Sequence, residues 1–195
     1  MPVRSRWSGE KALCRLCALP VLLLLLAAPA AALDTIWLVR HAEKVESWPT
    51  DRDLDALQPL SREGTARAEA LSDRFKDDGI AAVYTSRTTR TLATGLPLAA
   101  RTKIPLIADD ATTKPSEIPP FLAKLRERHA GDKAVLIVGH SNTIPQLLAA
   151  LGATPDCFAR LGIRKAPDGG LVIDGYDGVW RVDVAKKGCA GVARE

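Results

Sequence analysis

Histidine is scarce in this sequence. Three histidines occur among 195 residues, at positions 41, 129 and 140. No two of them have the short spacing of zinc ligands, such as a pair four residues apart on one helix face. The sequence therefore gives no support to a metallohydrolase, and we expect no metal site.

Long apolar runs are absent except near the N-terminus. Residues 1–15 carry four basic side chains and one acidic one, residues 16–28 are almost wholly apolar, and Ala30-Ala31-Ala32 offers an A-x-A cleavage site. The apolar run is shorter than the about 20 residues that span a bilayer. We predict a signal peptide over 1–32 and a periplasmic or secreted domain over 33–195. Contact with a membrane follows only if the signal segment stays uncleaved.

The net positive charge is also small once this segment is removed. The whole chain has a net charge of +4 and a pI near 9.0, but the first 32 residues contribute +3. The remaining 163 residues carry only +1, so a nucleic-acid partner is not expected. They show no internal repeat, low-complexity tract or interdomain linker, and their number fits one domain with one core.

Cysteine is nearly absent from the predicted mature chain, where only Cys157 and Cys189 remain. In an oxidising compartment an even number of thiols is consistent with one disulfide. Two unrelated thiols are the alternative, and the sequence does not choose between them.

Apolar segments and amphipathic segments alternate along the predicted domain. A short apolar run bounded by turns is typical of a strand buried on both faces. This alternation predicts a three-layer α/β fold, with a mostly parallel sheet and helices on both faces. The expected strands are 35–39, 80–84, 104–107, 134–138 and, at or near an edge, 179–184; the expected helices are 61–79, 86–100, 117–129 and 142–151.

Three polar segments lie at the predicted carboxyl ends of strands, where ligands of open α/β sheets bind. They are Arg40-His41, 86–90 and 140–142. Arginine forks and backbone amides at helix starts are suited to phosphate, and a neutral imidazole is an adequate nucleophile. The sequence therefore indicates a phosphate site.

The same segments resemble, in order, the motifs of the histidine phosphatase superfamily, which is phosphoglycerate mutase-like in fold. Residues 38–43 (LVRHAE) are similar to its R-H-G-E signature, with Ala42 in place of glycine, and residues 60–64 (LSREG) to the start of its first helix. Residues 85–94 are similar to S-x-x-x-R-A-x-x-T, and 139–143 to G-H-x-N. The resemblance covers about residues 35–151 and points to a small exported phosphatase branch.

The resemblance implies roles for five residues. His41 would become phosphohistidine, while Arg40, Arg90 and His140 would bind the phosphoryl group, with Asn142 beside them. It implies no metal and no cofactor. Arg87 is the alternative to Arg90, but the spacing from the preceding serine favours Arg90.

The general acid stays open. Many family members use a Glu or Asp from the region after the third strand to protonate the leaving oxygen. Asp109 and Asp110 lie there, Glu117 follows, and Glu43 is a weaker candidate.

The function that these residues predict is that of a metal-independent phosphomonoester hydrolase. Its substrate would be a phosphorylated small molecule or a phosphoprotein. A phosphomutase of the same superfamily is the alternative within enzymes. A catalytically silent domain that binds a phosphate group or a partner is the alternative outside them.

Overall fold

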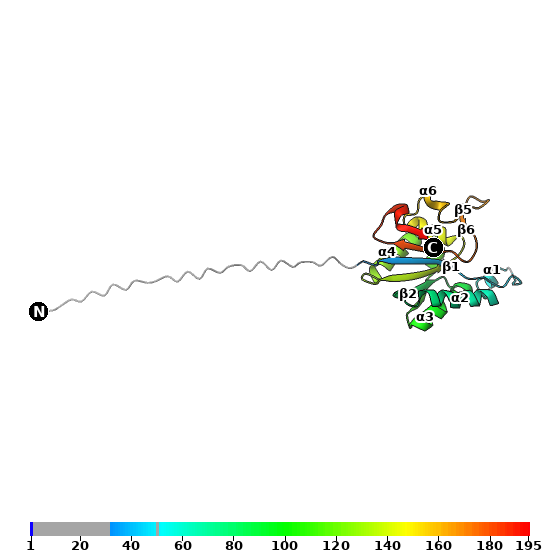
Figure 1. The fold of residues 1–195 in the computed structure, drawn as a ribbon, viewed down its shortest axis with the longest axis horizontal. Coiled ribbons are helices and arrows are strands. Elements are labelled where there is room, and N and C mark those ends of the chain that lie inside the picture. Colours follow the sequence, from blue (N-terminus) through cyan, green and yellow to red (C-terminus); the bar gives the residue numbers. More distant parts are fainter. Residues whose placement is uncertain (2–31, 50) are drawn as a thin grey trace.

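A computed structural model describes residue 1 and residues 32–49 and 51–195 (Figure 1). The predicted signal segment therefore lies almost wholly outside the described residues. Within the described part of the chain, no helix is both long and apolar enough to cross a membrane.

A six-stranded sheet forms the centre of the domain, in the order β3-β2-β4-β1-β7-β8. The first four strands are parallel, and β7 and β8 are antiparallel to their neighbours. Their bounds are β1 Thr35–Arg40, β2 Ile80–Thr85, β3 Leu106–Ala108, β4 Ala134–Gly139, β7 Val179–Asp183 and β8 Val192–Arg194.

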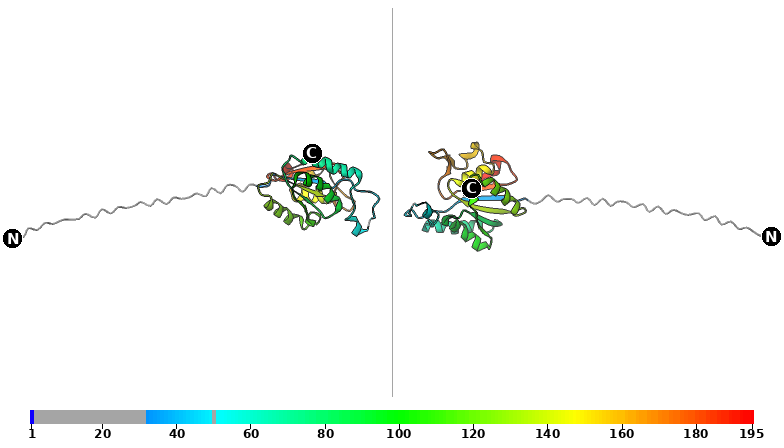
Figure 2. Two further views of the ribbon diagram at one scale, coloured as in Figure 1. Left: turned by 90° about the horizontal axis from the view of Figure 1, so that it is seen from below. Right: turned by 180° about the vertical axis from the view of Figure 1, so that it is seen from behind.

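Helices cover both faces of the sheet. On one face lie α2 (Arg62–Phe75) and α3 (Thr89–Thr102), and on the other α4 (Ile118–Arg128) and α5 (Thr143–Ala150), as Figures 1 and 2 show. Side chains of β1 alternate between the two cores: Ile36 packs in one and Trp37 in the other. The predicted three-layer α/β fold is confirmed, and this double coverage explains why the parallel strands are apolar throughout.

The C-terminal part contains more strands than we expected. Besides β7, which is second from the edge, it holds the edge strand β8 and a separate hairpin of β5 (Ile163–Lys165) and β6 (Leu171–Ile173). These three strands have three residues each and lie in a Gly- and Asp-rich region, where the sequence shows no apolar run that would identify them. A disulfide joins Cys157 in α6 (Pro155–Phe158) to Cys189 in the 3-10 turn Gly188–Gly191, so the two cysteines are paired.

Helix starts agree with the sequence at α2 and differ at α3. The Ser61 side chain caps α2 by accepting a hydrogen bond of 3.1 Å from the Gly64 amide. The sequence predicts the next helix from residue 86, but α3 begins three residues later, at Thr89. The Ser86 hydroxyl is thereby free to take part in the site.

Candidate functional site

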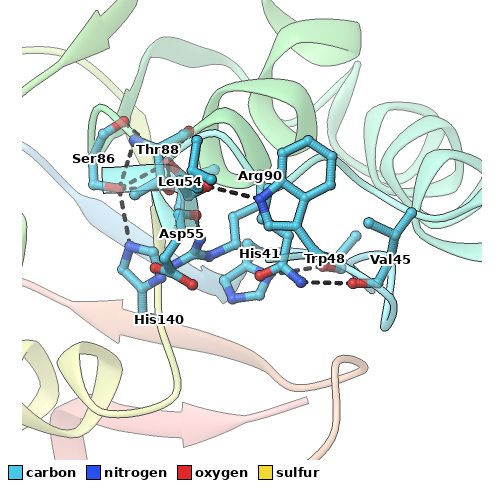
Figure 3. A network of polar contacts seen from close by, with 12 residues as sticks. His41, Val45, Trp48, Leu54, Asp55, Ser86, Thr88, Arg90 and His140 are labelled. Carbon is cyan, nitrogen blue, oxygen red and sulfur yellow. Dashed lines mark hydrogen bonds and ion pairs between the residues drawn. The ribbon is translucent and has the colours of Figure 1, made fainter. Parts of the chain in front are cut away.

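A buried histidine, His41, and a half-buried one, His140, lie side by side at the carboxyl ends of β1 and β4. These two strands are parallel, with Arg40 opposite Gly139. The residues that follow them, His41 and His140, therefore lie next to each other. The His41 amide donates to the Gly139 carbonyl at 2.9 Å, and the His41 and His140 ring centroids are 5.2 Å apart (Figure 3). The structure thus brings these two strand ends together, as the sequence predicts.

His41 is held as a neutral imidazole, and its Nε2 has no hydrogen-bond partner among the described residues. Its Nδ1 lies 2.8 Å from the Ala42 carbonyl oxygen, which can only accept, so Nδ1 carries the proton. Burial, assisted by the nearby His140 and arginine charges, lowers the pKa of His41 to about 3. Near neutral pH the Nε2 lone pair is therefore available to attack an electrophile.

His140 is also neutral, and its ring contacts the Ser86 hydroxyl. The distance from Nε2 to Ser86 Oγ is 2.9 Å, and Thr143 Oγ1 accepts from the His140 amide at the start of α5. Burial, followed by the charge of Arg90, lowers the pKa of His140 to about 4. Two neutral imidazoles thus lie edge to face at the carboxyl ends of β1 and β4.

Two guanidinium groups lie next to the histidines. Arg40 donates to the Gly175 carbonyl at 2.8 Å and stacks on Tyr176, with 4.1 Å from Cζ to the ring centroid. Arg90 donates to the Asp55 backbone oxygen at 2.6 Å and to its carboxylate at 3.0 Å. In each arginine the Nε is buried without a partner in the described structure, and an anion is the ligand that would satisfy such a donor.

The predicted site residues line one cavity of about 400 Å³ at this edge of the sheet. Arg40, His41, Arg90, His140 and Asn142 all contribute to it. Its full lining is basic or polar and includes no carboxylate: Arg40, His41, Lys44, Thr88, Arg90, Thr113, His140, Ser141, Asn142 and Thr143. The cavity can therefore hold a phosphate-sized anion.

The structure does not bring the suggested general acids from the region after β3 into this cavity. Asp109 accepts from the Ala111 amide at 2.9 Å and lines a separate, smaller cavity. Asp110 pairs with Arg87, whose side chain is 72% exposed. Arg87 is absent from the lining of the cavity, and Arg90 is part of it.

The two remaining acid candidates are engaged elsewhere. Glu43 forms a bidentate ion pair with Arg67, with distances of 2.6–2.9 Å, and this pairing lowers the pKa of Glu43. Glu117 pairs with Lys114 at 3.1 Å. Neither carboxylate lines the cavity of the two histidines.

Three contacts of the site were missed by sequence reasoning: Asp55 on Arg90, Tyr176 on Arg40 and Ser86 on His140. Asp55 lies in the polar stretch before α2, which has no periodicity to read. Tyr176 precedes β7, and only the pairing of β7 with β1 brings it to Arg40. Among the described residues there is also no group of three or more His, Cys, Asp or Glu side chains that could hold a metal ion.

Comparison with known proteins shows which family this chain is similar to. The family model of the histidine phosphatase superfamily (branch 1) matches residues 36–112, a range that contains Arg40, His41 and Arg90. No curated protein matches the chain. Over residues 36–112 the chain is therefore similar to the histidine phosphatase superfamily.

Solved structures share this fold at low sequence identity. A protein from Agrobacterium tumefaciens assigned to the phosphohistidine phosphatase SixA is 21% identical, with a TM-score of 0.55 over 77% of this chain and 92% of that one. A mycobacterial glucosyl-3-phosphoglycerate phosphatase is 16% identical, with a TM-score of 0.55 over 83% and 97%. The protein histidine phosphatase SixA, solved with tungstate, is 14% identical, with a TM-score of 0.54 over 83% and 94%.

Proposed function

We propose that this phosphatase is a metal-independent phosphomonoester hydrolase that acts through a phosphohistidine on His41. The observation that carries the proposal is the state of His41: buried, neutral, fixed through Nδ1, and with Nε2 free beside two guanidinium groups. An imidazole in this state can attack phosphorus without first losing a proton.

Each neighbour has a role in the proposed reaction. Arg40 and Arg90 would bind the equatorial phosphoryl oxygens, whose charge is spread over all three in the transition state. His140 and the helix start at Asn142 would add hydrogen-bond donors on the other side. Water would then hydrolyse the phosphohistidine and regenerate His41.

We further propose that the substrate is a phosphoprotein or a phosphorylated small molecule and that the protein is exported. Structural relatives are named for phosphohistidine and for glucosyl-3-phosphoglycerate, which are a phosphoprotein group and a phosphorylated small molecule. Either class would suit a cavity open at the sheet edge. Export through a signal peptide at 1–32 is supported by the Cys157–Cys189 disulfide, a bond typical of oxidising compartments.

The mechanism is tested by trapping the intermediate. The protein, incubated with a radiolabelled aryl phosphate and quenched rapidly, should carry an acid-labile, alkali-stable phosphoryl group on His41. His41→Ala should lose both the label and turnover, while His129→Gln should keep both, because His129 bonds to Tyr84 and Asp132 away from the cavity. A label on another residue, or full turnover by His41→Ala, would disprove the proposal.

A further inference from the structure

The proposed reaction needs a proton for the leaving oxygen. An alkoxide leaves poorly unless a positioned acid protonates it. The cavity of His41 and His140 has no carboxylate in its lining. Of the acids that the sequence suggested, Asp109 and Asp110 form local contacts outside it, and both oxygens of Glu43 are bound by Arg67. Another carboxylate, that of Asp55 at the end of α1 (Arg52–Asp55), lies at the margin of this cavity.

Asp55 contacts the phosphate-site arginine in two ways. Arg90 donates through Nη1 to the Asp55 backbone oxygen at 2.6 Å and through Nη2 to Oδ2 at 3.0 Å. The Arg90 side chain is 10% exposed and that of Asp55 is 47% exposed. The carboxylate thus reaches from the solvent side onto a buried guanidinium, and Oδ1 has no hydrogen-bond partner among the described residues.

Two hydrogen bonds fix the backbone on either side of Asp55. The Trp48 indole donates to the Leu54 carbonyl at 2.8 Å, and the Thr89 amide at the start of α3 donates to the Ala56 carbonyl at 2.8 Å. Figure 3 shows Asp55 reaching toward Arg90 and the two histidines from this anchored segment. The position of the carboxylate is therefore built into the fold.

A second cavity of about 400 Å³ adjoins the first, and Asp55 lines it. Lys44 lies on both cavities, and the rest of the second lining is Glu43, Glu46, Trp48, Pro49, Gln58 and Tyr176. If the phosphoryl group occupies the first cavity, the leaving group extends into the second. Asp55 contacts Arg90 of the first cavity and lines the second, which is where the bond between phosphorus and the leaving oxygen would lie.

The electrostatics agree with this placement. The charged and titratable groups around Asp55 are Arg90 and His140, and across the second cavity Glu43, Lys44, Glu46 and Tyr176. The Asp55 charge raises the pKa of His140, against the larger lowering by burial and by Arg90. Asp55 is thus within electrostatic reach of the reaction centre.

We propose that Asp55 is the catalytic acid and base of this phosphatase; the inference rests on the proposed function. As His41 Nε2 forms its bond to phosphorus and the ester P–O bond breaks, the Asp55 proton moves to the leaving oxygen. In the second step the carboxylate takes a proton from water, the water oxygen bonds to phosphorus, and the P–N bond breaks.

The leaving group provides the test. Phenyl phosphate needs protonation of its leaving oxygen, whereas 2,4-dinitrophenyl phosphate does not. Asp55→Asn should lower kcat/KM on phenyl phosphate on the order of 10²-fold and on the dinitrophenyl ester only slightly. The amide keeps an oxygen for Arg90, and equal melting temperatures would verify folding. Asp51→Asn, which removes an exposed carboxylate at the start of the same helix, should change neither rate.

Other outcomes overturn the inference. An equal loss on both esters would mean that Asp55 only holds Arg90. A gain on both would mean that its carboxylate competes with phosphate for Arg90, and no change would mean that it has no part in the reaction. The proposed function fails separately, if the wild-type protein forms no phosphohistidine even with the dinitrophenyl ester.

Discussion

The neutral state of His41 has a consequence for the pH dependence of activity. An ordinary histidine is protonated below about pH 6.5 and stops being a nucleophile there. Burial lowers the pKa of His41 to about 3 and that of His140 to about 4. Because the lowered pKa keeps the lone pair free, the loss of activity should begin only at these lower pH values.

We therefore expect no fall of kcat/KM between pH 7 and pH 5 that is due to the histidines. The measurement is a pH profile on an aryl phosphate, corrected for the ionisation of the ester itself. An acid limb near pH 4 agrees with burial of both imidazoles. A corrected limb near pH 6.5 would show that His41 titrates as an exposed histidine.

Arg90 and Arg87 form a matched pair of arginines for substitution. Arg87 lies two residues before α3 and Arg90 is the second residue of α3. The Arg90 side chain is 10% exposed and lines the cavity, whereas that of Arg87 is 72% exposed and pairs with Asp110. Arg90→Ala should cost about 10²-fold or more in kcat/KM, as the loss of a preorganised electrostatic group does. Arg87→Ala should cost little. The reverse result would place the phosphate on the other arginine.

At the scale of elements, the contact between α3 and the end of β1 holds the site together. Thr94 Oγ1 in α3 accepts from the Ala42 amide at 2.9 Å and donates to the Arg90 carbonyl at 2.7 Å. One buried hydroxyl thus links Ala42, the residue after the proposed nucleophile, to the helix turn that carries Arg90. Positioning of this kind has large effects on rate, since small displacements of reacting groups are costly.

Thr94→Val should lower kcat/KM on the order of tenfold. It should also lower the free energy of unfolding by about 1–3 kcal/mol, because it leaves the buried Ala42 amide without a partner. Thr94→Ser keeps the hydroxyl and should retain most of both. A loss in Thr94→Ser with little change in Thr94→Val would assign the role to the methyl group instead. Steady-state kinetics and denaturant unfolding of the three proteins measure this.

The same scale shows what the sequence could predict. The strands that contain Leu38, Val83 and Ile137 are buried on both faces, so an unbroken apolar run identifies them. Parallel pairing then brings the residues after β1, β2 and β4 to one edge. Arg40, His41, Arg90 and His140 could therefore be grouped from the amino-acid sequence alone.

Contacts that depend on irregular segments could not be predicted. Asp55 reaches Arg90 from a polar stretch with no helical or strand period, and Tyr176 reaches Arg40 from a turn between short strands. Asp109 and Asp110 follow the right strand, but local bonds to Ala111 and Arg87 hold them away from the cavity. The position of a residue in the sequence predicts at which end of the strands it lies, but not the direction in which its side chain points.

For the whole molecule, the disulfide decides how firmly the C-terminal part is held to the sheet. The bond joins α6 to the turn before β8 across 32 residues, and the loop that it closes contains β5, β6 and β7. Arg40, His41, Arg90 and His140 lie outside this loop. Gly175 and Tyr176, which contact Arg40, lie inside it, so one link connects the loop to the site.

Removal of the disulfide should therefore reduce stability much more than activity. Closing a loop of this length stabilises by roughly 3 to 4 kcal/mol in the chain-entropy model, which corresponds to about 10 °C in Tm for a domain of this size. Cys157→Ala/Cys189→Ala should melt lower by about that amount, yet keep most of its kcat/KM at 25 °C, because β7 still pairs with β1 along five residue positions and keeps Tyr176 near Arg40. Calorimetry and kinetics on the oxidised protein and the variant measure both effects, and alkylation of the oxidised protein without reductant must leave both cysteines unmodified. A large loss of activity at 25 °C with an unchanged Tm would contradict this account, since the disulfide would then act on Arg40 rather than on the stability of the fold.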